Sequence, residues 1–154
     1  MLAIIRIRGE INLSPRIKKT LDLLGLRNVN TCVLVSERNE SRKMVDIVKD
    51  YVAFGEINEW TTEKLLEKRG RMVGNKKVSE TVLKENDCVS FKELSKKIIE
   101  KNVGLKNFAG LKPFFRLTPP KKGFERGGIK KAWQAGGALG YRGNEINELL
   151  LRMI

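Results

Sequence analysis

Histidine is absent from this 154-residue chain, and cysteine occurs only twice. The lack of histidine excludes every mechanism that needs a histidine base, together with the zinc sites that use imidazole ligands. Cys32 and Cys88 lie far apart and form no C-x-x-C pair, so a thiolate zinc site is also disfavoured. Cys32 lies in the apolar run TCVLV, where we expect a small core side chain. We therefore predict no metal, no cofactor and no catalytic residue.

Long apolar runs are also missing. No stretch approaches the roughly 18 residues that a membrane span needs, and arginines interrupt the apolar N-terminus MLAIIRIRGEI, unlike a signal peptide. The glycine- and lysine-containing segment at 121–128 lacks the G-x-x-x-x-G-K-[ST] pattern of a phosphate-binding loop. We expect a soluble, cytoplasmic protein with no membrane partner and no small-molecule substrate.

Positive charge is abundant and unevenly distributed. The formal net charge is +13, and the segment Gly104–Gly143, called the arm below, holds nine Lys or Arg against one acid, Glu125. The arm also contains nine of the 14 glycines and six of the ten aromatic residues. Cations neutralise phosphates, glycine permits close approach of the main chain, and aromatic rings stack on unpaired bases. This composition predicts an RNA-binding segment, and its many aromatic residues disfavour the alternative of a disordered loop that contacts nothing.

The candidate RNA-binding residues fall into two groups. Those of the arm are Lys106, Lys112, Phe114, Arg116, Lys121, Lys122, Arg126, Lys130, Lys131, Trp133, Tyr141 and Arg142. Those outside it are Arg6 and Arg8 near the N-terminus, and Arg69, Arg71, Lys76 and Lys77 around Gly70 and Gly74. Solvent-exposed edge charges are an equal alternative for Arg6 and Arg8.

Residues 1–60 follow a β-α-β-α-β pattern. Alternation over residues 3–8 indicates a strand with one face toward a core and the other offering Arg6 and Arg8. Ser14-Pro15 begins a helix that Gly25 ends, and the apolar segment 31–35 indicates a central strand. A second helix with its apolar stripe at 44–51 and a third strand at 54–58 follow. Tyr51 and Trp60 border the sheet, where we expect core packing.

Residues 61–154 form an extension. A helix capped by Thr61 or Thr62 is interrupted by the basic segment 68–77, and a short helix begins at Ser79 and runs through Leu83. Ser90 and Glu93 form a capping box, in which Val89 would pack on the following turn. After these helices (61–103) come the arm (104–143) and a C-terminal helix (144–154) capped by Asn144 that packs on the body.

Two adjacent phenylalanines within the arm are expected to point in opposite directions. In an extended segment, Phe114 and Arg116 lie on one side and Phe115 on the other. We predict that Phe115 packs on the protein while Phe114 and Arg116 face RNA.

Several segments resemble the universal L-thirty family of large-subunit ribosomal proteins, in its archaeal form, whose eukaryotic members are called L-seven. The resemblance rests on LLGLRNV (23–29), KDYVAFGEI (49–57), KRGRMVGNKKVSE (68–80), FFRLTPPKKGF (114–124) and GGALGYRGNEINELLLRMI (136–154). Arg42-Lys43-Met44 matches the R-G-M of the family, with Lys43 in place of glycine, and Thr31 stands where archaeal members often have histidine. Arg42 and Lys43 therefore join the rRNA-binding candidates.

The resemblance implies a structural, non-catalytic constituent of the large ribosomal subunit. Its partners would be large-subunit rRNA, near the 5S rRNA, and neighbouring ribosomal proteins. The fold class that we predict is α+β: a three-stranded sheet with β-α-β-α-β order and two helices on one face, resembling a ferredoxin-like fold, with a helical and basic C-terminal extension. The domains would be a core at 1–60 and an extension at 61–154. A free-standing RNA-binding or RNA-chaperone protein is the alternative function.

Overall fold

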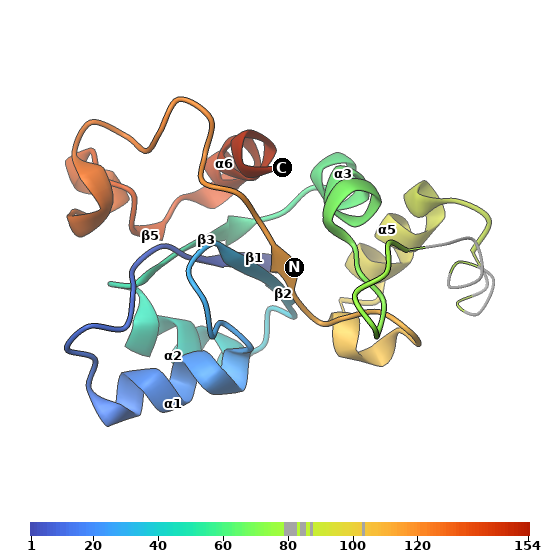
Figure 1. The fold of residues 1–154 in the computed structure, drawn as a ribbon, viewed down its shortest axis with the longest axis horizontal. Helices are drawn as coiled ribbons and strands as arrows, with labels where there is room; N and C mark the ends of the chain where they lie inside the picture. Colours follow the sequence, from blue (N-terminus) through green and yellow to red (C-terminus); the bar gives the residue numbers. More distant parts are fainter. Residues whose placement is uncertain (79–82, 84–85, 87, 103) are drawn as a thin grey trace.

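The computed structural model describes residues 1–78, 83, 86, 88–102 and 104–154 (Figure 1). The helix predicted to begin at Ser79 lies outside the described residues, except for the buried Leu83. The predicted element order of the first 60 residues is confirmed, with two helices between three strands. These elements are β1 (Leu2–Arg6), α1 (Pro15–Leu24), β2 (Thr31–Val35), α2 (Asn39–Val48) and β3 (Val52–Glu56).

Local sequence signals explain where α1 begins and ends. The Ser14 hydroxyl accepts a hydrogen bond from the Ile17 amide, and Pro15 occupies the first turn, where its missing N–H costs nothing. Gly25 ends the helix at φ 82°, in the left-handed region that glycine enters without steric cost. The second helix ends at Val48, earlier than predicted, so Tyr51 lies between α2 and β3.

The sheet has five strands, so the predicted three-stranded sheet is wrong. Its order is β4-β2-β1-β3-β5, and both additional strands come from the arm. At one edge, β4 (Phe115–Arg116) is antiparallel to β2, with Phe115 opposite Cys32. At the other edge, β5 (Gly140–Tyr141) is parallel to β3, with Tyr141 opposite Phe54. The central strand is β1 and not β2, whose apolar character instead reflects the neighbour that the arm supplies.

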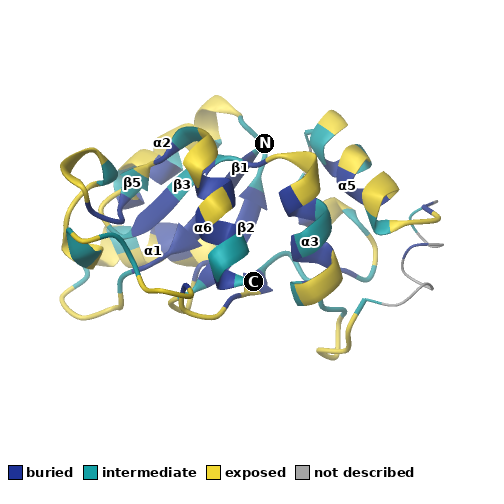
Figure 2. Cartoon of the chain, turned by 90° about the horizontal axis from the view of Figure 1, so that it is seen from above, coloured by how far each residue is buried: buried dark blue, intermediate teal, exposed yellow. Residues whose placement is uncertain are grey.

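Both faces of the sheet are buried (Figure 2). Helices α1 and α2 cover one face, where Ile4 and Val33 join a hydrophobic cluster with Leu21 and Val45. On the other face, Ala3 and Ile5 join a cluster with residues of α3 (Glu59–Arg69), α5 (Phe91–Glu100) and α6 (Ile146–Met153). The expectation that one face of β1 offers two arginines is therefore wrong. The predicted core and extension share this second cluster.

The extension begins one turn earlier than predicted. The Asn58 side chain caps α3 by accepting a hydrogen bond from the Thr61 amide at 2.8 Å, while Thr61 and Thr62 are buried inside the helix. Trp60, expected in the core, is 54% exposed on the first turn of this helix. The first amides of a helix have no partner within the helix. Asn58, directly before α3, supplies an acceptor to one of them, the Thr61 amide.

The Ser90 cap of α5 is confirmed, but the reciprocal bond of Glu93 goes to Val89 and not to Ser90, and the hydrophobic staple is not formed. The Ser90 hydroxyl accepts from the Glu93 amide, and the Glu93 carboxylate accepts from the Val89 amide at 2.7 Å. Val89 itself is 89% exposed, so it does not pack on Leu94. The cap therefore holds its shape through polar contacts alone.

The C-terminal helix returns the chain to the body as predicted, with Ile146, Leu149, Leu150 and Met153 buried. Its cap differs, because Asn144 lies within a 3-10 turn (Gly143–Glu145) and its side chain does not cap the helix. The predicted core position of Cys32 is confirmed, and burial raises the pKa of its thiol. Among the described residues, no helix is long and apolar enough to cross a membrane.

Candidate nucleic-acid interface

The arm runs from one edge of the sheet to the other (Figure 1). It starts at a 3-10 turn (Leu105–Asn107), adds β4 to the sheet, and passes the C-terminal end of α6. There the Leu117 amide donates to the Asn30 carbonyl at 2.9 Å and the Thr118 amide to the Met153 carbonyl at 3.1 Å. The chain then forms a compact turn-rich unit, residues 121–139, which we call the lobe, before it enters β5. The arm is therefore fixed to the body at several places.

The arm's single acid is the centre of the lobe. Glu125 accepts two hydrogen bonds from the Arg142 guanidinium, at 2.9 and 2.6 Å, and one from Arg152 of α6 at 2.8 Å. Partial burial of the carboxyl would raise its pKa, but the hydrogen bonds and positive charges of the two arginines outweigh that effect and hold the pKa of Glu125 at about 2. This carboxylate stays ionised and is turned inward, so it does not offset the cations on the lobe's surface.

Arg142 is an organising residue and not a surface one. Its side chain is 1% exposed, and besides Glu125 it donates to the Ala138 carbonyl at 3.0 Å. Its guanidinium carbon lies 4.3 Å from the centre of the Trp133 ring, a cation–π contact that fixes the indole. The prediction that Arg142 faces RNA conflicts with this burial, because its guanidinium contacts Glu125, Ala138 and Trp133 inside the protein.

Close packing of the main chain explains two of the lobe's glycines. A Cβ atom on Gly127 would lie 2.6 Å from the Gly136 carbonyl oxygen, and one on Gly137 would lie 2.2 Å from the Lys131 carbonyl oxygen. The main chain at Gly127 and Gly137 therefore contacts the main chain at Gly136 and Lys131 with no side chain between them. The closely packed backbone, the Glu125 pair and the buried side chains of Ala138 and Leu139 form the interior of the lobe, and its lysines lie outside.

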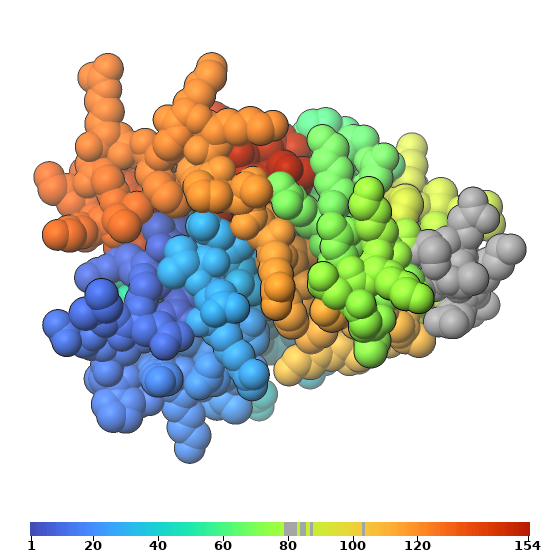
Figure 3. Space-filling model, in the orientation of Figure 1, coloured from blue at the N-terminus to red at the C-terminus, as the bar shows by residue number. Residues whose placement is uncertain are grey.

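The lobe presents its cations outward (Figure 3, orange). Its exposed basic residues are Lys121, Lys122, Arg126, Lys130 and Lys131. The clustering that the sequence predicted is therefore present on one compact unit.

A second basic patch forms where the segment 68–77 meets the start of the arm. Bridges join Arg71 to Lys77 and Met72 to Leu111, and the Lys112 amide donates to the Arg71 carbonyl at 2.9 Å. Lys76 and Lys77 are exposed here, and Lys112 donates through Nζ to the Asn75 side chain at 3.2 Å. Two segments of candidates, distant in sequence, thus lie side by side.

Arg69 has a structural role near this patch. Its Nη2 donates to the Thr118 hydroxyl at 3.1 Å and to the Ile154 carbonyl at 2.8 Å. It therefore ties α3, the arm and the C-terminus together while remaining half-exposed.

Arg6 is buried, contrary to the prediction that it faces RNA. It is 1% exposed, and its Nη1 donates to the carbonyls of Leu26, at 2.8 Å, and Arg27. It secures the turn between α1 and β2 from inside the protein. Arg8, two residues on, is half-exposed, with its guanidinium 4.8 Å from the centre of the Tyr51 ring.

The adjacent phenylalanines point in opposite directions, as predicted. Phe115 is 2% exposed and belongs to the cluster of α3, α5 and α6, whereas Phe114 is half-buried against the cluster of α1 and α2. Arg116 is exposed, with its guanidinium 6.0 Å from the Phe114 ring centre. Phe114 and Arg116 line a hollow at the β2–β4 edge together with Arg27.

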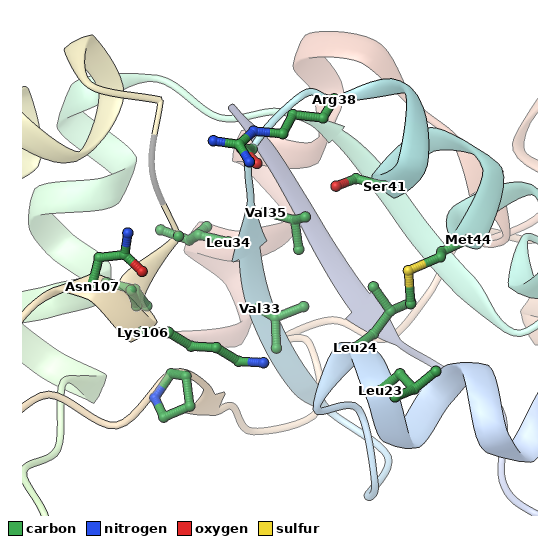
Figure 4. Close-up of a pocket in the computed structure, with 14 residues that line it drawn as sticks. Leu23, Leu24, Val33, Leu34, Val35, Arg38, Ser41, Met44, Lys106 and Asn107 are labelled. Atoms are coloured by element: carbon green, nitrogen blue, oxygen red, sulfur yellow. The ribbon is translucent and has the colours of Figure 1, made fainter.

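The remaining candidates lie at separate places. Arg42 of α2 forms an ion pair with Glu37, and Lys43 beside it is exposed. Lys106 lines an apolar hollow of about 290 Å³ between α1, β2 and the start of the arm, with Arg38 at its other end (Figure 4). The structure does not gather these residues with the lobe.

A groove of about 700 Å³ separates the lobe from α2 and the sheet edge. Tyr141 and Trp133, both predicted, line it together with Phe54 and with Tyr51, for which core packing was expected and which is partly buried against the cluster of α1 and α2. Tyr51 follows α2 directly, and no local pattern shows that the β3–β5 pairing brings it opposite the lobe. Within the described part of the chain, no group of three or more Cys, Asp or Glu side chains forms a potential metal site.

Comparisons with known proteins agree with this architecture. The family described as Ribosomal protein L30p/L7e matches residues 2–52, which cover β1 to the start of β3. Over 152 residues, the chain is 43% identical to the "Large ribosomal subunit protein uL30" of Methanococcus vannielii, covering 99% of this chain and 98% of the relative. It is 45% identical over 154 residues to the protein of the same name from Nanoarchaeum equitans, covering 100% and 99%. Since the two relatives match the chain over nearly its whole length, including the arm and α6, the chain belongs to the ribosomal protein L30p/L7e family.

Proposed function

We propose that this protein is a structural constituent of the large ribosomal subunit that binds rRNA through the arm and helps to fold and stabilise the subunit. The chain matches essentially the whole length of two relatives, and both are named as proteins of the large ribosomal subunit. The observation that carries the RNA-binding part is the inward position of Glu125. Because the arm's only acid is paired with Arg142 and Arg152, the surface of the lobe is left cationic. Such a surface attracts a phosphate backbone.

The main parts of the interface are the lobe and the patch at 71–77 and 112, and further assigned residues lie outside both of them. Their cations contact phosphates, which positions the protein without reading sequence. The residues that we assign to rRNA are Arg8, Lys43, Arg71, Lys76, Lys77, Lys112, Phe114, Arg116, Lys121, Lys122, Arg126, Lys130, Lys131, Trp133 and Tyr141. Lys106 and Arg42 are peripheral contributors, and Arg69 combines an RNA contact with its structural one. Arg6 and Arg142 support the interface from within.

The other partners that we propose are neighbouring ribosomal proteins. A position near the 5S rRNA is what the family resemblance implies. The protein works in the cytoplasm as part of the subunit, and it acts as a structural component and not as an enzyme.

Co-sedimentation tests this proposal against a free-standing RNA-binding or RNA-chaperone role. A structural constituent stays with large subunits through a high-salt wash and is present in a fixed ratio to them. A free-standing protein dissociates in the wash and sediments with many RNAs. Recovery of the protein only in the unbound fraction would reject the ribosomal assignment.

A further inference from the structure

Aromatic rings gather in the groove between the lobe and the body. Tyr51, Phe54, Trp133 and Tyr141 all line it, although they come from the turn between α2 and β3, from β3, from the lobe and from β5. The volume, about 700 Å³, lies within the roughly 300–1,000 Å³ of ordinary ligand pockets. In most proteins such rings pack in the core, so their presence around an open groove indicates a ligand with flat faces.

The rings are held in place by protein contacts. Arg142 lies against Trp133 at 4.3 Å, and the Tyr141 hydroxyl donates to Glu56 at 2.8 Å. The Tyr141 and Phe54 rings are 5.6 Å apart. Because these rings are already fixed, a base that stacks on them costs little additional ordering.

One wall of the groove carries a fixed cation. The Arg8 guanidinium lies 4.8 Å from the Tyr51 ring and donates through Nη1 to the Asp50 carbonyl at 3.2 Å. Lys49 is on the same wall, and Lys130 of the lobe faces them from the opposite wall. A phosphate in the groove would therefore meet positive charge on both sides.

Two acids, Asp46 and Asp50, also line the groove. Carboxylates repel phosphates, but they accept hydrogen bonds from the exocyclic amino groups of bases. An acidic peptide would be repelled by them without offering flat rings to stack. The mixture of cations, carboxylates and aromatic rings thus suits a nucleotide better than a peptide.

We propose that this groove holds an unpaired nucleotide of the rRNA, with its base stacked on the aromatic rings and its phosphates between the Arg8 and Lys130 walls. The inference rests on the proposed function and deepens it, since it assigns single-stranded RNA to one place in an interface that otherwise contacts the backbone. Proteins that recognise RNA loops commonly stack splayed bases on aromatic side chains.

The chain's two tryptophans allow a direct test. Trp60 is exposed on α3 and outside the groove, whereas Trp133 lines it. In the Trp60→Phe protein, Trp133 is the only tryptophan, and its fluorescence is titrated with single-stranded deca-cytidylate and with a ten-base-pair RNA duplex. We expect the single strand to quench the emission and the duplex to bind without comparable quenching. The Trp133→Phe protein, with only Trp60, serves as the control and should show no quenching by either RNA.

Binding constants give the second measurement. Trp133→Leu should weaken binding of the single strand by about 5- to 150-fold, which corresponds to the stacking contribution of one base, and duplex binding by less than about two-fold. Lys122→Ala, a matched change on the outer surface of the lobe, should weaken both RNAs by the same factor. Melting curves identify any variant that unfolds, and the quenching of Trp133 is measured in the Trp60→Phe protein, in which the groove is unchanged.

The outcomes separate this inference from the proposed function. If neither RNA binds, the proposed function fails. If both RNAs bind but Trp133 emission does not change, or if the duplex or poly-glutamate quenches it as strongly, the groove does not hold an unpaired nucleotide and the inference is overturned.

Discussion

The core and the arm each contain a buried arginine, and the two regions satisfy it differently. In the core, Arg6 donates to the main-chain carbonyls of Leu26 and Arg27, while its nearest acid, Glu10, lies at 3.3 Å and is largely exposed. In the arm, Arg142 donates two hydrogen bonds to the two carboxylate oxygens of Glu125. The two carbonyls that Arg6 contacts belong to the turn between α1 and β2, whose main chain is held by hydrogen bonds from the Leu26 amide to Leu21 and from the Asn30 amide to Arg6. The lobe is likewise ordered by main-chain hydrogen bonds, such as that from the Gly127 amide to the Gly136 carbonyl, but its buried arginine is paired with a carboxylate of the same segment.

The arm's attachment to the sheet is the most sensitive element in this comparison. Phe115→Ala removes a side chain that is 2% exposed in the cluster of α3, α5 and α6, and the free energy of unfolding should fall by about 3–5 kcal/mol. Phe114→Ala, one residue away and half-buried, should cost clearly less. Urea denaturation of both variants measures the difference. Equal losses would mean that the two side chains are equally buried.

Glu125→Gln should lower the free energy of unfolding by about 1–3 kcal/mol, because it leaves the buried Arg142 without its ionised partner. Glu10→Gln is the matched change in the core, and it should stay within about 0.5 kcal/mol because Arg6 keeps its carbonyl acceptors. Thermal melting of both variants at neutral pH checks this. A greater loss for Glu10→Gln would reverse the comparison.

Acid should weaken the same pair. The pKa of Glu125 is about 2 in the folded protein, below its ordinary value of 4.5. A carboxyl with a depressed pKa contributes stability above its unfolded pKa and loses it as the pH falls toward the folded value. The stability advantage of the wild-type protein over Glu125→Gln should therefore be full above about pH 4.5 and shrink toward pH 2. Urea titrations of both proteins at several pH values measure it; an advantage that is independent of pH would contradict the ionic pairing.

The smallest effect on stability is expected on the lobe's outer surface. Replacing Lys121, Lys122, Lys130 and Lys131 by alanine should change the unfolding free energy by no more than about 0.5 kcal/mol for each exposed lysine. The salt dependence of RNA binding should nevertheless fall by up to about three units, at roughly 0.7 for each lost phosphate contact. Lys18 and Lys19 of α1, also exposed, provide a control double substitution. An unchanged slope would remove the four lysines from the interface.

Helices were easier to predict from the sequence than the sheet edges. The segments at 15–24 and 91–100 carry both an apolar stripe and a capping residue, and these local signals are sufficient. Strands β4 and β5 are two residues long, too short to show any alternation. Their pairing depends on contacts with β2 and β3, which are remote in the sequence, so the arm was predicted as a loop.

The candidate site was predictable where charge and exposure coincide. The lysines of the lobe are exposed, while glycine, the Glu125 pair and the apolar residues Ala138 and Leu139 occupy its interior. Arg6 could not be distinguished from an exposed arginine, because its partners are carbonyl groups positioned by the end of α1. The groove was equally hidden, since Tyr51 and Trp133 meet only through the β3–β5 pairing.

The two short edge strands have a consequence for synthesis of the chain. Until the arm has been made, β2 and β3 are the outer strands of the nascent sheet, and each presents unpaired amides and carbonyls over five residues. Such edges can pair with other chains. Arrival of Phe115 and then Gly140 adds a strand of two residues to each edge, which pairs with Thr31 and Cys32 of β2 and with Ala53 and Phe54 of β3. The arm therefore has a role in completing the sheet of the newly made protein that does not depend on RNA.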